Sequence, residues 1–183
     1  MVRFAVTMAL VEIALTIGAA FAITLVEPGE PYLSEADLRG LRIPFESVRT
    51  SRTKRFDSQV FYDTRVQLLG PPQTLYVSVR TESSAVDFEH RLNRERQRQR
   101  DPKQGAIALL EEPMPGEQGY TLRHRGPSSV RSELVRFRGT DLFIVSVGRS
   151  RPFDSTPDQE VVRCERRART VELYLLEKLG WRN

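Results

Sequence analysis

The chain has 183 residues, a formal net charge of +4 and a single cysteine, Cys164. This length suits one domain plus a membrane anchor, and 39% hydrophobic with 28% charged residues indicates a globular domain rather than a disordered chain. One cysteine excludes an intrachain disulfide, a thiolate zinc site and a CxxCH haem attachment, while so modest a positive charge does not demand nucleic acid as a partner.

The first segment of the chain is strongly apolar. Between Arg3 and Glu27 the only charged side chain is that of Glu12. Residues 4–26 would extend about 34 Å as a helix, which is enough to cross a hydrocarbon core of about 30 Å. We therefore expect residues 1–27 to form a single transmembrane anchor.

A cleaved export signal is the main alternative for this segment, because Ala20-Phe21-Ala22 matches an A-x-A cleavage site. Cleavage after Ala22 would release a secreted or periplasmic protein. Two features favour the uncleaved anchor: Glu12 lies where a signal needs an uncharged core, and the apolar run continues past Ala22 to Val26. A buried core helix is disfavoured, since the polar residues form no continuous stripe.

Charges on either side of the anchor predict its orientation. Arg3 and the terminal amine precede it, whereas Glu27, Glu30, Glu35 and Asp37 follow it. The positive-inside rule then places the N-terminus in the cytoplasm and the rest of the chain outside it, on the periplasmic side of the cell membrane.

Glu12 has an energetic meaning inside such an anchor. A carboxylate near the bilayer centre costs about 2.5–3.5 kcal/mol on insertion scales, unless it is protonated or finds a polar partner. Gly18 and Ala19 are small enough to let another helix approach closely. We therefore predict that Glu12, Gly18 and Ala19 pack against helices of other membrane-protein subunits.

After the anchor, residues 28–40 predict a Pro/Gly hinge and a short helix, capped by Ser34 with Asp37 three positions later. The polar, basic residues 47–58 predict a loop or a sheet edge. Alternating hydrophobicity predicts strands over 58–69 and 73–80, separated by a turn at 70–73.

A helix is predicted over 84–100, starting at a Ser84-x-x-Asp87 cap. Beyond it come a short apolar run, a loop at 113–119, an alternating strand over 120–125 and a hairpin. The hairpin strands span 132–138 and 142–147 around a turn at Gly139 and Thr140.

The last helix is predicted to begin at a Thr156 cap with Pro157 and Gln159 behind it, and to stop at Gly180. Strands and helices do not alternate regularly along the chain. We therefore expect an α+β domain over residues 41–183, with an antiparallel sheet and packed helices that include a long C-terminal one.

The end of the 84–100 helix and the residues after it are markedly basic. Six cations cluster there: Arg91, Arg94, Arg96, Arg98, Arg100 and Lys103. No aromatic residue interleaves with them, so no stacking platform for single-stranded nucleic acid is predicted. The functional interpretation is a surface for an acidic protein partner or anionic lipid, and the alternative is an ordinary solvated helix face.

Chemistry-bearing motifs are missing from the sequence. His90 and His124 are the only histidines, and their separation predicts no metal site. Glu111 and Glu112 are adjacent, so they would point to opposite sides of a strand and form a poor acid–base pair. Cys164 falls on the buried face of the last helix, which predicts a packing role. We therefore predict no enzyme, no metal and no cofactor.

The leading functional prediction is a non-enzymatic accessory or structural subunit of a larger respiratory, photosynthetic, transport or envelope membrane complex. One helix anchors it, an exported domain makes the contacts, and nucleic acid is not an expected partner. A secreted or periplasmic ligand-binding protein is the first alternative. A cytoplasm-facing basic domain that binds nucleic acid or lipid is the second, and it requires the opposite topology.

Overall fold

The computed structural model describes residues 25–27, 32–54, 60–70, 73–81, 83–100, 106–112 and 117–181. Most of the predicted anchor, with Glu12, Gly18 and Ala19, lies outside these residues, so the anchor stays a prediction. Its last three residues form the short strand β1 (Leu25–Glu27), which pairs with β2 and is therefore extended chain rather than helix. Within the described ranges, no helix is long and apolar enough to span a bilayer.

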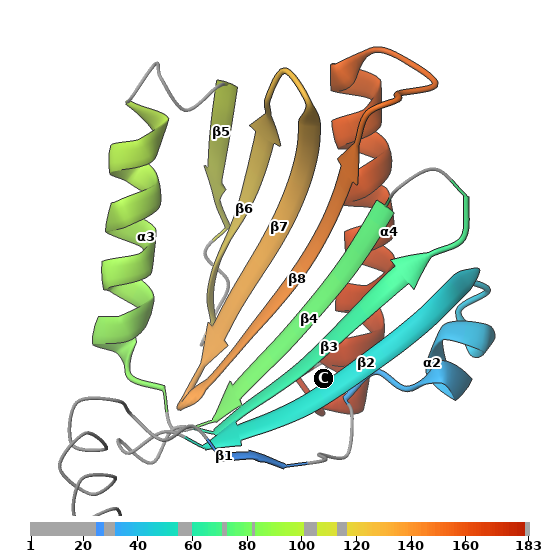
Figure 1. Cartoon of the computed structure of the whole chain (residues 1–183). Helices are drawn as coiled ribbons and strands as arrows, with labels where there is room; N and C mark the ends of the chain where they lie inside the picture. Colours follow the sequence, from blue (N-terminus) through green and yellow to red (C-terminus); the bar gives the residue numbers. More distant parts are fainter. Residues whose placement is uncertain are drawn as a thin grey trace, which may run out of the picture.

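The described strands form one antiparallel sheet in the order β1-β2-β3-β4-β8-β7-β6-β5 (Figure 1). Two meanders build most of it: β2 (Phe45–Lys54), β3 (Val60–Leu68) and β4 (Gln73–Thr81), then β5 (Ala106–Glu111), β6 (Gln118–Arg125), β7 (Ser129–Arg138) and β8 (Asp141–Ser150). Pairing of β4 with β8 joins the two meanders in the middle of the sheet.

Three helices, α2 (Glu35–Gly40), α3 (Ala85–Gln99) and α4 (Pro157–Lys178), complete the described part of the chain. Each begins with a capping box, in which the cap side chain accepts from a backbone N–H and the residue three positions later bonds back. The pairs are Ser34 with Asp37, Ser84 with Asp87, and Thr156 with Gln159. The three helix starts are therefore as predicted.

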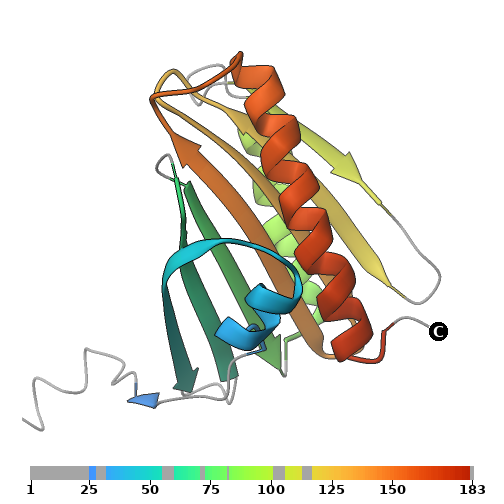
Figure 2. The same cartoon turned by 90° about the vertical axis from the view of Figure 1, so that its right-hand side faces the viewer.

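The sheet lies between helices (Figures 1 and 2). On the α4 face, α4 and α2 cover a core that includes Val77, Val145 and Leu175. On the opposite α3 face, Phe88 and Leu92 of α3 pack against side chains such as Tyr120, Val135 and Ile144. Because neighbouring strand residues point to opposite faces, one central strand such as β8 supplies both cores. The predicted α+β class, with an antiparallel sheet and a C-terminal helix, is confirmed.

Residues 47–58, which the sequence predicts as a loop or a sheet edge, follow the second alternative over 47–54. Most of them lie in β2, a ten-residue strand held between β1 and β3. Its polar sequence fits this place, because no side chain from Phe45 to Thr53 is fully buried. The predicted strands over 58–69 and 73–80 correspond to β3 and β4.

The predicted hairpin corresponds to β7 and β8, whose pairing extends beyond the predicted limits at both outer ends. The turn residue Gly139 has a φ of 61°. Two-residue hairpin turns require such a positive φ at the first central position, which glycine adopts without steric cost.

Packing of α4 on the sheet can be tested with two leucines of the same helix. Leu175 is fully buried, whereas Leu173 is 42% exposed. We expect Leu175→Ala to lower the free energy of unfolding by about 2–5 kcal/mol through lost burial and a cavity. The matched control Leu173→Ala should change it by no more than about 0.5 kcal/mol. Urea unfolding measures both, and equal losses would contradict this docking of α4.

Candidate functional site

The structure divides the predicted basic surface into inward and outward arginines. The Arg91 side chain is only 18% exposed, because its guanidinium contacts the sheet. Its Nε donates to the Tyr120 hydroxyl at 2.8 Å, and its Nη2 donates to Glu133 Oε1 at 2.6 Å. Arg91 therefore fastens α3 to β6 and β7 and does not belong to an outer binding surface.

Most of the outward arginines of α3 have carboxylate partners within the chain. Arg96 forms a two-pronged contact with Glu111 at 2.8 and 2.7 Å. Arg94 and Arg98 both approach the buried Glu95, at 3.7 and 3.1 Å. The face therefore carries less free positive charge than its arginine count suggests. Arg100 caps the C-terminal end of α3, and Lys103 lies outside the described residues.

A buried ion-pair network that the sequence analysis did not predict ties α4 to β7. Arg136 is 1% exposed on the α4 face of β7, beneath α4. Its Nη2 lies 2.5 Å from Glu112 Oε2 and 2.6 Å from Glu172 Oε1 of α4. Gly119 leaves room for it, since a Cβ there would lie 2.4 Å from Arg136 Nη1.

A second arginine, which lies on α4, completes this network. Arg169 donates to Glu112 and Glu172, and also to the Thr121 hydroxyl at 2.8 Å. Burial alone would raise the pKa of Glu112, but the hydrogen bonds from Arg169 and Thr121 and the charges of Arg136 and Arg169 outweigh it and lower the pKa to about 2. A carboxylate held this firmly as an anion suits a structural tie rather than proton transfer.

The adjacent glutamates behave as the sequence predicted. Glu111 faces α3 and binds Arg96, whereas Glu112 contacts Arg136 and Arg169 on the α4 side. They do not form a carboxylate pair.

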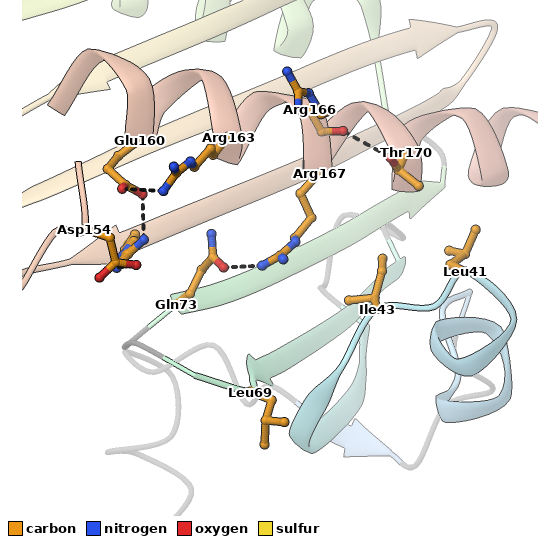
Figure 3. Close-up of a pocket in the computed structure, with 11 residues that line it drawn as sticks. Leu41, Ile43, Leu69, Gln73, Asp154, Glu160, Arg163, Arg166, Arg167 and Thr170 are labelled. Carbon is orange, nitrogen blue, oxygen red and sulfur yellow. Dashed lines mark hydrogen bonds and ion pairs between the residues drawn. The ribbon is translucent and has the colours of Figure 1, made fainter. Parts of the chain in front are cut away.

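The candidate site is a cleft of about 450 Å³ beside the first half of α4 (Figure 3). One wall is α4 itself, with Arg163, Arg166 and Arg167. The other wall is apolar and comes from the connection after α2 and the corner after β3. It carries Leu41, Ile43 and Leu69. We call this feature the α4 cleft.

The apolar wall is positioned by the way α2 ends. Ile43 N–H donates to Leu38 O at 2.9 Å and Arg42 N–H to Arg39 O at 3.0 Å, which is a Schellman motif. Arg42 occupies the position usually held by glycine and has a φ of 55°. This conformation costs a non-glycine residue about 1–2 kcal/mol, and the burial of Leu38 and Ile43 in the core offsets it.

The deep end of the α4 cleft is electrically balanced. Arg149, on β8, is only 6% exposed and lies 2.7 Å from Glu160 and 2.8 Å from Asp154. Glu160 is itself buried and also accepts hydrogen bonds from the Ser155 hydroxyl and from Arg163. Burial would lower the pKa of Arg149, but its hydrogen bond to Asp154 and the charge of Glu160 raise it. These groups therefore form a structural cluster at the start of α4.

The outer wall of the α4 cleft keeps an excess of positive charge. Arg167 donates to the side-chain oxygen of Gln73, which is neutral. Arg166 has no carboxylate partner in the part of the chain that the structure describes. Two guanidinium groups beside an apolar wall can therefore hold an anionic group that carries apolar atoms.

Metal and thiol chemistry find no support in the described ranges. No group of three His, Cys, Asp or Glu side chains there could hold a metal ion. Cys164 is fully buried, as predicted, and burial raises the pKa of its thiol. A protonated, buried thiol suits packing rather than reactivity.

Comparison of the chain with protein-family models, with curated proteins and with solved structures gave no match. No relative therefore assigns a role to any residue. The function has to be inferred from the shape and charge of the described residues.

The buried network predicts that replacing Arg136 strongly lowers the stability of the fold. Arg136→Leu should lower the free energy of unfolding by about 3–5 kcal/mol at pH 7, because Glu112 and Glu172 lose their shared partner. The matched control is Arg131→Leu, an exposed arginine on the opposite face of the same strand. Arg131→Leu should change the free energy of unfolding by no more than about 0.5 kcal/mol. Similar losses for both variants would contradict the role of Arg136 in holding α4 to β7.

The loss of stability in Arg136→Leu should depend on pH. The pKa of Glu112 is about 2 in the folded protein and 4.5 when unperturbed, so its stabilisation is complete above pH 4.5 and disappears as the pH falls towards 2. The stability difference between wild type and Arg136→Leu should therefore shrink over this range. Urea unfolding at a series of pH values measures it.

Proposed function

We propose that the chain is a non-enzymatic accessory subunit of a larger membrane complex, and that its extramembrane domain binds an acidic segment of another subunit in the α4 cleft. The observation that carries the proposal is that Arg166 and Arg167 line the same cleft as the apolar side chains of Leu41, Ile43 and Leu69. A peptide with an acidic and an apolar side chain matches both walls.

Charge supports an acidic partner. The α4 cleft is lined by four arginines against Asp154 and Glu160, which leaves an excess of two positive charges, since 4 − 2 = 2. The two acids are already bound to Arg149. An incoming carboxylate would therefore meet the guanidinium groups of Arg166 and Arg167, which have no carboxylate partner among the described residues and can bind carboxylates in a two-pronged geometry.

The state of the carboxylates supports binding rather than catalysis. A general acid or base needs a pKa near the working pH and access to a substrate. In the α4 cleft, Glu160 is 1% exposed and is held by Arg149, Arg163 and Ser155. Such a carboxylate is bound on several sides by its own chain and lacks access to a ligand.

The membrane location comes from the predicted anchor. We expect the mature chain to retain residues 1–26 and to stay with membranes after an alkaline carbonate wash, because the apolar run is long enough to span a bilayer. Intact mass and N-terminal sequencing measure this. A mature N-terminus at Ile23 would instead favour a secreted or periplasmic ligand-binding protein, with the α4 cleft as its site.

If the partner binds in the α4 cleft, replacing the arginines of the cleft should weaken the association. A double variant, Arg166→Gln with Arg167→Gln, should weaken association at least about tenfold, because hydrogen bonds to charged groups contribute about 1.5–3 kcal/mol each. Co-purification from membranes in mild detergent, repeated at increasing salt, measures the loss. Wild-type association should weaken with salt, and association of the variant should respond less.

The matched control neutralises two arginines of α3, Arg94→Gln with Arg100→Gln. It should leave association unchanged, and urea unfolding should show that both variants fold as stably as wild type. If the α3 variant alone lost its partner, the contact would belong to the basic surface of α3 and the assignment to the α4 cleft would be wrong.

A further inference from the structure

The α3 face of the sheet has a polar half that no described helix covers. α3 lies beside the β5 end of the sheet, and β2, β3 and β4 lie away from it (Figure 1). Under α3 the face is apolar, with Tyr120, Val135 and Ile144. Towards β2 it becomes polar and hollowed.

A row of cross-strand neighbours puts two arginines side by side on this polar half. Arg49 of β2 is directly opposite Arg65 of β3, and Arg65 is directly opposite Tyr76 of β4. Side chains at such positions share a face and have Cβ atoms about 4.5–5.5 Å apart, and like charges placed there destabilise the pairing. Among the residues that the structure describes, neither arginine forms an ion pair with a carboxylate.

One carboxylate lies beside the two arginines but is engaged elsewhere. Asp63 precedes Arg65 by two positions on the same strand face, and its Oδ1 accepts a hydrogen bond from the Tyr76 hydroxyl at 2.7 Å. Arg49, Arg65, Asp63 and Tyr76 together line a hollow of about 280 Å³. The hollow is close to the lower end of small-molecule sites, which begin near about 300 Å³.

The geometry points to a site for a phosphate group that keeps a proton, held between the guanidinium groups of Arg49 and Arg65. An oxyanion between them would replace the repulsion of like charges by two attractions, and guanidinium groups match the spacing of phosphate oxygens. This site lies on the opposite face of the sheet from the α4 cleft and does not depend on the proposed function.

Asp63 supplies the selectivity for a protonated anion. An ionised carboxylate only accepts hydrogen bonds and has four lone-pair positions, so it can accept from Tyr76 and from one more donor. The P–OH of a phosphate can be that donor. Sulfate carries no proton at neutral pH, so its oxygens would face the carboxylate with unrelieved repulsion.

The test uses the purified full chain in detergent, titrated with sodium phosphate or sodium sulfate at constant ionic strength in chloride. We expect phosphate to raise the thermal midpoint in a saturable way, as ligand linkage requires, and to bind at least about tenfold more tightly than sulfate by calorimetry. Phosphatidylglycerol, whose phosphodiester has no P–OH, should not compete with phosphate when it is added to the detergent micelles.

Two variants assign the effect to the site. Arg65→Gln should weaken phosphate binding at least about tenfold and yet raise the thermal midpoint in chloride, because the repulsion from Arg49 disappears. Asp63→Asn should let sulfate bind as tightly as phosphate, since the amide donates where the carboxylate accepts. Arg49→Gln replaces Arg65→Gln if the latter does not fold.

The control variant Arg94→Gln, on α3, should behave as wild type with both anions. Equal binding of phosphate and sulfate by wild type would overturn the proposal, because a general salt effect would explain it. Phosphate binding that survives both Arg65→Gln and Arg49→Gln would overturn it as well.

Discussion

Pairing of β4 with β8 is the constraint on which the rest of the structure depends. The two strands are far apart in sequence, and their register places Gln73 opposite Arg149 and Tyr76 opposite Ser146. β4 runs directly into α3 and β8 runs directly into α4, so this one pairing fixes where both helices start. The meanders on either side form from local hairpins, but only the β4–β8 ladder combines them into a sheet with two cores.

The α4 cleft is a direct consequence of that register. Gln73 begins β4 and Arg149 is near the end of β8, so their pairing brings an amide and a guanidinium together under α4. The side-chain oxygen of Gln73 then accepts a hydrogen bond from Arg167, and Arg149 donates one to Glu160. A shift of β4 by one residue would turn Gln73 to the other face of the sheet, and the cleft would lose this part of its floor.

Helix α4 presents three different sides, and each follows from helical spacing. Cys164, Ala168, Val171 and Leu175 recur at intervals of three and four and pack against the sheet. Glu165, Arg169 and Glu172 follow one edge of that stripe and meet Arg123, Thr121 and Arg136 of the sheet. Arg163, Arg166 and Arg167 follow the other edge and face the α4 cleft. The first edge is thus neutralised within the fold, whereas on the second edge Arg163 contacts Glu160 but Arg167, among the described residues, contacts only the neutral Gln73.

The local elements could be predicted from the sequence because their signals are local. Capping boxes at Ser34, Ser84 and Thr156 and the turn at Gly139 each depend on residues within a few positions. The site residues could not, because Arg149, Gln73 and Arg167 meet only through the β4–β8 pairing. Two local patterns in the sequence nevertheless mark charged residues that face the core. Arg91 and Glu95 recur with Phe88 and Leu92 at helical spacing, which marks them as inward-facing, and Arg136 shares a strand face with the buried Leu134.

The distribution of charge explains why a net charge of +4 says little about partners. The chain has 28 Lys and Arg against 24 Asp and Glu, and buried acids such as Glu95, Glu160 and Glu172 are bound to arginines of the same chain. A buried charge without a partner would cost several kcal/mol, so these acids need their arginines for folding. Among the described residues, arginines without a carboxylate partner lie at the α4 cleft (Arg166) and on β2 and β3 (Arg49 and Arg65), but also elsewhere on the surface, as Arg131 on β7 does. Net charge is therefore a poor guide to partners, because it does not show which arginines the fold has already paired with its own acids.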